Sequence, residues 1–178
     1  MPYILSADRA LESSDEQNYL IQAAQSLRAA RSDADKAIEA RDFVAYLIDT
    51  VYGEPCFDNA NAMAGNVPRP MVVCANILAA NIVDIHERAG GREGLLNYAL
   101  TRFFNEAYPA PRYRDFNAIA GVLSSLLRLA HPGHIELLGM LACCRDEYYR
   151  KYAGPYEDKK EAQNGAVLIP AAPPPSGY

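Results

Sequence analysis

The sequence predicts an all-α protein, a bundle of about six helices followed by an extended Pro-rich C-terminal arm. Apolar residues recur at helical spacing in successive segments between residues 16 and 153. Glycines, prolines and capping residues separate these segments, and no alternating strand pattern occurs among them. We therefore expect a helical domain over residues 1–162 and an arm, extended or disordered, over residues 163–178.

The first two helices are expected at residues 16–31 and 34–52. Ser13-Ser14-Asp15 and Ser32-Asp33 supply the capping side chains that begin them. Gly53-Glu54-Pro55 ends the second helix, and residues 53–70 read as a long loop that is either functional or mobile.

A third helix over residues 70–89 is apolar on most sides, so we expect it to be central. Its two asparagines, Asn76 and Asn81, would then need buried partners. Further helices are expected at residues 93–106, 114–130 and 134–152. The last of them should stop at Gly154-Pro155, because glycine ends helices and the residue before proline avoids the α region.

Composition excludes some classes of protein. The 178 residues are 50% hydrophobic and carry a net charge of −5, which argues against a general nucleic-acid binder. No apolar run approaches the roughly 20 residues that span a bilayer, and the N-terminus lacks the features of a signal peptide. The four cysteines form no CxxC pair and read as free thiols of a reducing cytosol, in preference to a redox or metal role.

The stretch from Cys143 to Lys160 is the densest in aromatic and charged groups. Tyrosine rings beside guanidinium groups could hold a nucleotide base and its phosphates. The alternative is packing, with the cations favouring the dipole at a helix C-terminus. The candidate binding residues in this stretch are Arg145, Tyr149, Arg150 and Tyr156.

A second candidate group lies on the helix expected at residues 93–106, where Asn97, Tyr98 and Arg102 occur close together. An arginine within an amphipathic pattern needs an acidic partner or an anionic ligand. We expect an internal salt bridge from Arg102 to Glu147 or Glu157, with ligand binding as the alternative.

Signatures of catalysis or metal binding are missing. The sequence has no GxSxG, P-loop, GxGxxG or HExxH motif. His131 and His134 lie at a Pro-Gly turn, where an exposed helix cap is the simpler interpretation than a metal site. We expect a protein that is not an enzyme and that uses no cofactor or metal.

Several motifs resemble a family of small uncharacterised proteins of tailed phages and prophages. These motifs are Met1-Pro2-Tyr3-Ile4, the Asn97-Tyr98 to Arg102 helix, Glu147-Tyr148-Tyr149-Arg150-Lys151, Pro155 to Lys160 and Asn164-Gly165. The resemblance implies a setting in phage biology and in the bacterial cytoplasm, with the virion as the alternative location. It implies no reaction.

These observations predict a non-enzymatic phage or prophage accessory protein that binds a host protein or a small ligand. Self-association is expected, because helices 70–89 and 114–130 are more apolar than a lone bundle requires. Two alternatives are a sponge that captures nucleotide signals of bacterial immunity, and a virion or assembly component.

Overall fold

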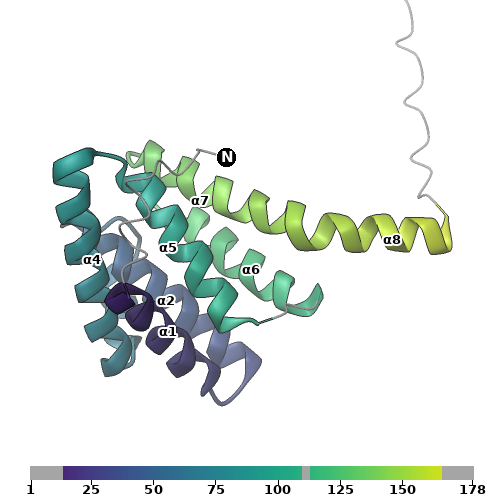
Figure 1. Ribbon diagram of the computed structural model, residues 1–178, viewed down its shortest axis with the longest axis horizontal. Coiled ribbons are helices and arrows are strands. Elements are labelled where there is room, and N and C mark those ends of the chain that lie inside the picture. The colour runs from purple at the N-terminus through teal and green to yellow at the C-terminus, as the bar shows by residue number, and fades with distance from the viewer. Residues whose placement is uncertain (1–13, 110–112, 166–178) are drawn as a thin grey trace, which may run out of the picture.

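The computed structural model describes residues 14–109 and 113–165 and confirms the all-α fold (Figure 1). The expected helices are present within a few residues of their predicted limits. They are α1 (Ser14–Arg28), α2 (Asp33–Tyr52), α4 (Arg69–Ala89), α5 (Arg92–Ala107), α6 (Tyr113–Leu129) and α7 (Ile135–Tyr148). No described helix has the length and apolar character that crossing a membrane requires.

Local chemistry fixes the ends of α2. The Ser32 hydroxyl accepts a hydrogen bond from the Asp35 amide at 3.1 Å, which satisfies one of the free amides of the first turn. At the other end Gly53 adopts φ of 71°, a left-handed conformation that costs glycine little.

The core joins α2, α5 and α7 through aromatic side chains. Phe43 and Phe103 lie 4.6 Å apart between ring centroids, and Phe104 meets the edge of Tyr148 at 5.9 Å. These rings are buried, so removing them from water contributes much of the driving force for assembling the three helices.

The loop expected at residues 53–70 contains a further short helix, α3 (Ala60–Asn66). An isolated antiparallel bridge between Phe57 and Ala130 joins this segment to the end of α6. The His131 amide also donates to the Cys56 carbonyl at 2.9 Å. The segment is therefore held by the bundle and does not read as a loose connection.

The expectation that the helix over residues 70–89 is central was wrong. In the structure α4 lies at one edge of the bundle, against α1, α2 and α5 (Figure 1). Val73 is exposed, and Asn76 is exposed too, accepting a hydrogen bond from the Tyr46 hydroxyl at 3.0 Å. An apolar composition did not reveal which side of the helix would face solvent.

The expected stop at Gly154-Pro155 was also wrong. A π-helical turn, η2 (Tyr149–Ala153), follows α7 and leads into α8 (Gly154–Asn164). The Gly154 amide donates to the Tyr149 carbonyl, the five-residue spacing that defines a π turn. In an α-helix the proline ring would clash with the carbonyl four residues earlier, and the wider turn gives Pro155 room to continue the helix.

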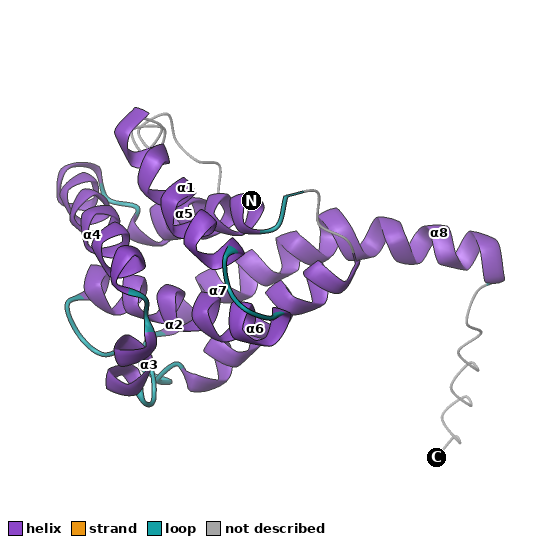
Figure 2. Ribbon diagram, turned by 90° about the horizontal axis from the view of Figure 1, so that it is seen from below, coloured by secondary structure: helices purple, strands orange, loops and turns teal. Residues whose placement is uncertain are grey.

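The α8 helix projects away from the bundle (Figures 1 and 2). None of its residues is buried, whereas η2 still packs against α6 and α7. The end of α8 at Asn164 lies two residues beyond the domain limit expected at 162. The predicted arm is outside the described residues from 166 onward.

Candidate functional site

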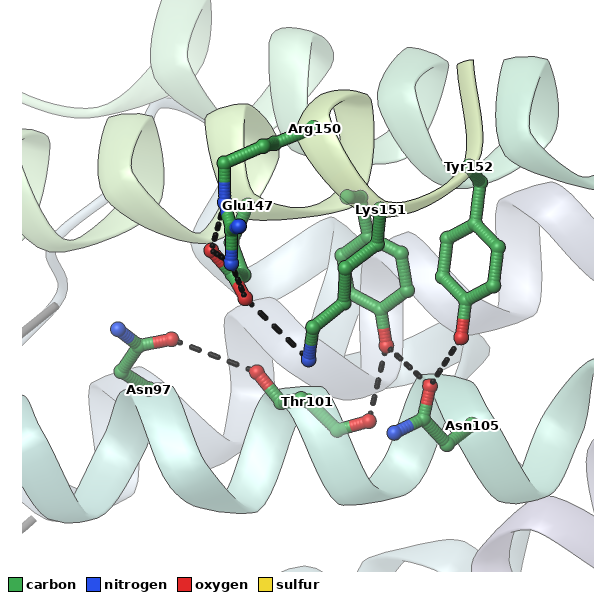
Figure 3. Close-up of polar contacts among 8 residues, drawn as sticks. Asn97, Thr101, Asn105, Glu147, Arg150, Lys151 and Tyr152 are labelled. Atoms are coloured by element: carbon green, nitrogen blue, oxygen red, sulfur yellow. Dashed lines mark hydrogen bonds and ion pairs between the residues drawn. The ribbon is translucent and has the colours of Figure 1, made fainter. Parts of the chain in front are cut away.

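Polar side chains form a row on α5 that faces the π turn. Asn97, Thr101 and Asn105 are four residues apart, so they share one face of the helix. Figure 3 shows them opposite Glu147 and Tyr152, which belong to α7 and η2. On one side is this row of α5, and on the other are the C-terminal end of α7 and η2. We call the contact between these two sides the polar seam.

Tyr148 anchors the polar seam. Its side chain is 2% exposed, and its hydroxyl lies 2.9 Å from the Thr101 carbonyl oxygen and 3.1 Å from Asn105 Oδ1. The single hydroxyl proton is donated to one of these acceptors at a time. Burial raises the pKa of Tyr148 well above its usual range, so the phenol stays protonated and serves as a structural donor.

Tyr152 adds a second phenol to the polar seam. Its ring stacks on that of Tyr148 with centroids 5.7 Å apart and planes inclined at 21°, and its hydroxyl lies 3.4 Å from Asn105 Oδ1. Asn105 therefore meets two tyrosines from consecutive turns. This arrangement fixes the direction in which η2 leaves α7.

Glu147 gathers two cations on the outer side of the polar seam (Figure 3). Arg150 Nη2 lies 2.9 Å from Glu147 Oε1, and Lys151 Nζ lies 3.2 Å from the same oxygen. The hydrogen bond from Arg150, supported by the one from Lys151, lowers the pKa of Glu147. Both cations of η2 are thus engaged by a carboxylate one turn earlier, at the end of α7.

The other two aromatic candidates lie on different elements, Tyr149 on η2 against α6 and Tyr156 on α8. Tyr149 meets the edge of Phe116 at 6.0 Å, and its hydroxyl donates to Glu157 Oε2 at 2.7 Å. Tyr156 is exposed on α8, with Lys160 Nζ 5.7 Å from its ring centroid. Arg145 pairs with its neighbour Asp146 at 3.0 Å.

The predicted partners of Arg102 were wrong. Arg102 pairs with Glu106 one turn along α5, with Nη2 and Oε1 3.6 Å apart, and Glu106 also lies 3.7 Å from Arg28 of α1. Glu147 is occupied by Arg150 and Lys151 instead. Arg102 is therefore linked through Glu106 to Arg28, at the contact between α5 and α1, and not to the tyrosine-bearing stretch of α7 and η2.

The predicted candidates do not meet in one cleft. Asn97 lies in the polar seam, where the Thr101 hydroxyl donates to its Oδ1 at 3.4 Å, and Tyr98 packs partly buried against the core. Thr101, Asn105, Tyr148 and Tyr152 were missed, although the four-residue spacing of the α5 row and the pairing of two tyrosines were visible in the sequence.

A further cluster lies at the opposite end of α7. The Arg92 guanidinium stacks on the Tyr52 ring at 3.8 Å and pairs with Glu93 at 3.1 Å, while His134 meets the edge of Tyr52 at 5.8 Å. Burial raises the pKa of Tyr52 to about 12, so its hydroxyl remains protonated and donates to Glu93. These contacts satisfy one another and join α2 to α5.

Two groups close to this cluster bear on nucleophile and metal chemistry, the Cys56 thiol and the His131–Asp58 pair. Burial raises the pKa of Cys56 to about 12, so at neutral pH it is a thiol and a poor nucleophile. His131 Nε2 lies 3.3 Å from Asp58, but over the described ranges no three His, Cys, Asp or Glu side chains are grouped to hold a metal ion.

Comparison with known protein families found a match in the C-terminal part of the chain. A domain of unknown function, DUF6899, matches residues 133–167, a range that contains α7, η2 and α8. No curated protein and no solved structure matched the chain. In this chain, the matched residues include the π turn and the two helices on either side of it.

Proposed function

We propose that the protein is a non-enzymatic accessory protein of a phage or prophage that acts in the bacterial cytoplasm. It binds a host protein through α8 and does so as a homo-oligomer. The observation that carries the proposal is the exposure of α8, which has no buried residue and whose main described packing partner is η2.

The energetics of short helices support this use of α8. An isolated helix of fewer than about 12 residues is marginal in water, because most helical stability in proteins comes from packing. The 11 residues of α8 bury no side chain, and beyond the continuity with η2 they gain the hydrogen bond between Tyr149 and Glu157. A partner that packs on α8 would supply the missing contacts, and the polar seam holds the helix in place for it.

A protein partner fits the charges better than a nucleotide does. Phosphate recognition requires cations that can turn toward the ligand. Arg145, Arg150 and Arg102 each have a carboxylate within 3.6 Å, on a residue no more than one turn away in the chain. A nucleotide would have to displace these carboxylates, so the sponge alternative receives less support.

Charge reversal on α8 tests the proposal. Full-length Lys159→Glu/Lys160→Glu is compared with the wild type and with Arg69→Glu/Arg88→Glu, which reverses two exposed charges on α4. A host protein captured by the wild type should be lost with the α8 variant, retained with the α4 variant, and bind the purified wild type in calorimetry.

Two results would contradict the proposal. One is a partner retained equally by both double variants, and the other is the absence of any protein that binds the purified chain directly. Capture of phage structural proteins with the same dependence on α8 would favour the virion alternative instead.

A further inference from the structure

The α8 helix ends at an Asn-Gly sequence, Asn164-Gly165, and both residues are exposed. It is the only Asn-Gly pair in the chain, since every other asparagine precedes a residue with a side chain. Gly165 adopts φ of 84°, in the left-handed region that glycine tolerates, and a Cβ added there would meet nothing within 4 Å. Gly165 therefore has no side chain of its own, and no described atom on that side, to shield its backbone nitrogen.

This pair has the atoms for an intramolecular deamidation. The backbone nitrogen of Gly165 can attack the side-chain Cγ of Asn164, because this closes an unstrained ring, and glycine has no Cβ to crowd the attack. The new C–N bond replaces the bond from Cγ to the side-chain nitrogen, which leaves as ammonia after taking up the proton that the Gly165 amide loses. Water then opens the succinimide ring at either carbonyl, so that the product is aspartate or isoaspartate.

The fold holds this reaction back. The Gly165 amide donates a hydrogen bond to the Glu161 carbonyl at 2.8 Å, and this bond closes the last turn of α8. The nitrogen must leave this bond before it loses its proton and attacks Asn164. The reaction therefore proceeds from the state in which the last turn of α8 has opened.

The last turn of α8 opens readily. No residue of the helix is buried, and its last turn has no basic side chain to favour the negative end of the helix dipole. Glu161, which lies in that turn, carries the unfavourable charge there. Helix ends with these features fray at a small cost in free energy, so the open state is populated in the folded protein.

We propose that Asn164 is a self-modification site, which Gly165 converts to aspartate or isoaspartate at a rate set by the opening of the last turn of α8. The conversion is one-way and adds a negative charge at the negative end of the helix dipole. Isoaspartate also lengthens the main chain by a methylene, which shifts the hydrogen bonds of that turn. Modified chains should therefore keep the end of α8 open. The inference does not rest on the proposed function, because the reaction needs only the chain and water.

Ageing of the full-length protein at neutral pH and physiological temperature tests the proposal, with peptide mapping by mass spectrometry at each time point. Aspartate and isoaspartate should accumulate at Asn164 faster than at Asn76, an exposed asparagine followed by isoleucine. Asn164→Gln, whose longer side chain closes the ring poorly, should stay unmodified over the same period. In concentrated urea the wild-type rate at Asn164 should rise, because the last turn is then open in every chain.

Ala162→Gly tests the dependence on the helix, since glycine in an exposed helical turn lowers the stability of that turn. Deamidation of Asn164 and hydrogen exchange of the Gly165 amide should both rise by up to about fivefold, while the deamidation rate in urea stays unchanged. Ala80→Gly is the matched control, because it weakens an exposed turn of α4 and should leave both rates unchanged. Asn164 that stays intact while Asn76 reacts, a wild-type rate that is equal in the folded protein and in urea, or an Ala162→Gly rate equal to that of the wild type would each overturn the proposal.

Discussion

Replacing Tyr148 with phenylalanine removes one hydroxyl from the polar seam and leaves the ring in the core. The lost hydroxyl has the Thr101 carbonyl at 2.9 Å and the Asn105 side chain at 3.1 Å. A buried hydrogen bond contributes about 1 kcal/mol, and a partner left unsatisfied adds to the cost. We expect the free energy of unfolding to fall by about 1 to 2 kcal/mol.

For a protein of this length, that loss lowers the melting temperature by about 2 to 8 °C. Urea unfolding followed by circular dichroism measures the change in free energy directly. Tyr149→Phe is the matched control, because its hydroxyl donates to the exposed carboxylate of Glu157 and its loss should cost less than about 0.5 kcal/mol. If the two substitutions cost the same, the polar seam does not anchor the π turn.

Three other outcomes are expected. In the folded protein a maleimide should label about one thiol per chain, because Cys143 is exposed and the remaining cysteines are buried; labelling of all four without denaturant would contradict this burial. Ser32→Ala should cost about 1 kcal/mol in urea unfolding through loss of the α2 cap, and Ser32→Asp should retain it. Because the pKa of Glu147 is lowered in the folded state, its ionised carboxylate stabilises the fold at pH values above the ordinary glutamate pKa of about 4.3. This contribution is lost as the pH falls through the folded-state pKa. The destabilisation caused by Glu147→Gln should therefore be smaller at pH 3 than at pH 7, and an effect that grows in acid would refute the assignment.

The helices could be predicted because their signals are local. Apolar spacing and the breaks at Gly53, Gly90-Gly91 and Pro132-Gly133 reflect conformational preferences of a few neighbouring residues. The continuation through Gly154-Pro155 escaped prediction because it depends on a wider turn, and that turn is held by tertiary contacts of Tyr148 and Tyr152.

The arrangement of the candidate site could not be predicted for a different reason. Which side chains meet across two helices depends on how each helix is rotated about its axis, and a charge pattern does not fix that rotation. Arg102 thus pairs with Glu106 on its own helix. Tyr149 packs its ring against Phe116, whereas the neighbouring Tyr148 forms a hydrogen bond with the Thr101 carbonyl.

The π turn also sets the direction in which the side chains of α8 point around the helix axis. Each residue of an α-helix advances the direction of its side chain by about 100°, so deleting one residue between Tyr149 and Ala153 would swing the outward face of α8 by roughly that angle. Two chains with identical α8 sequences but differing by one residue in this turn would therefore offer different faces to a partner. Specificity can change here through chain length alone, with every α8 side chain left intact.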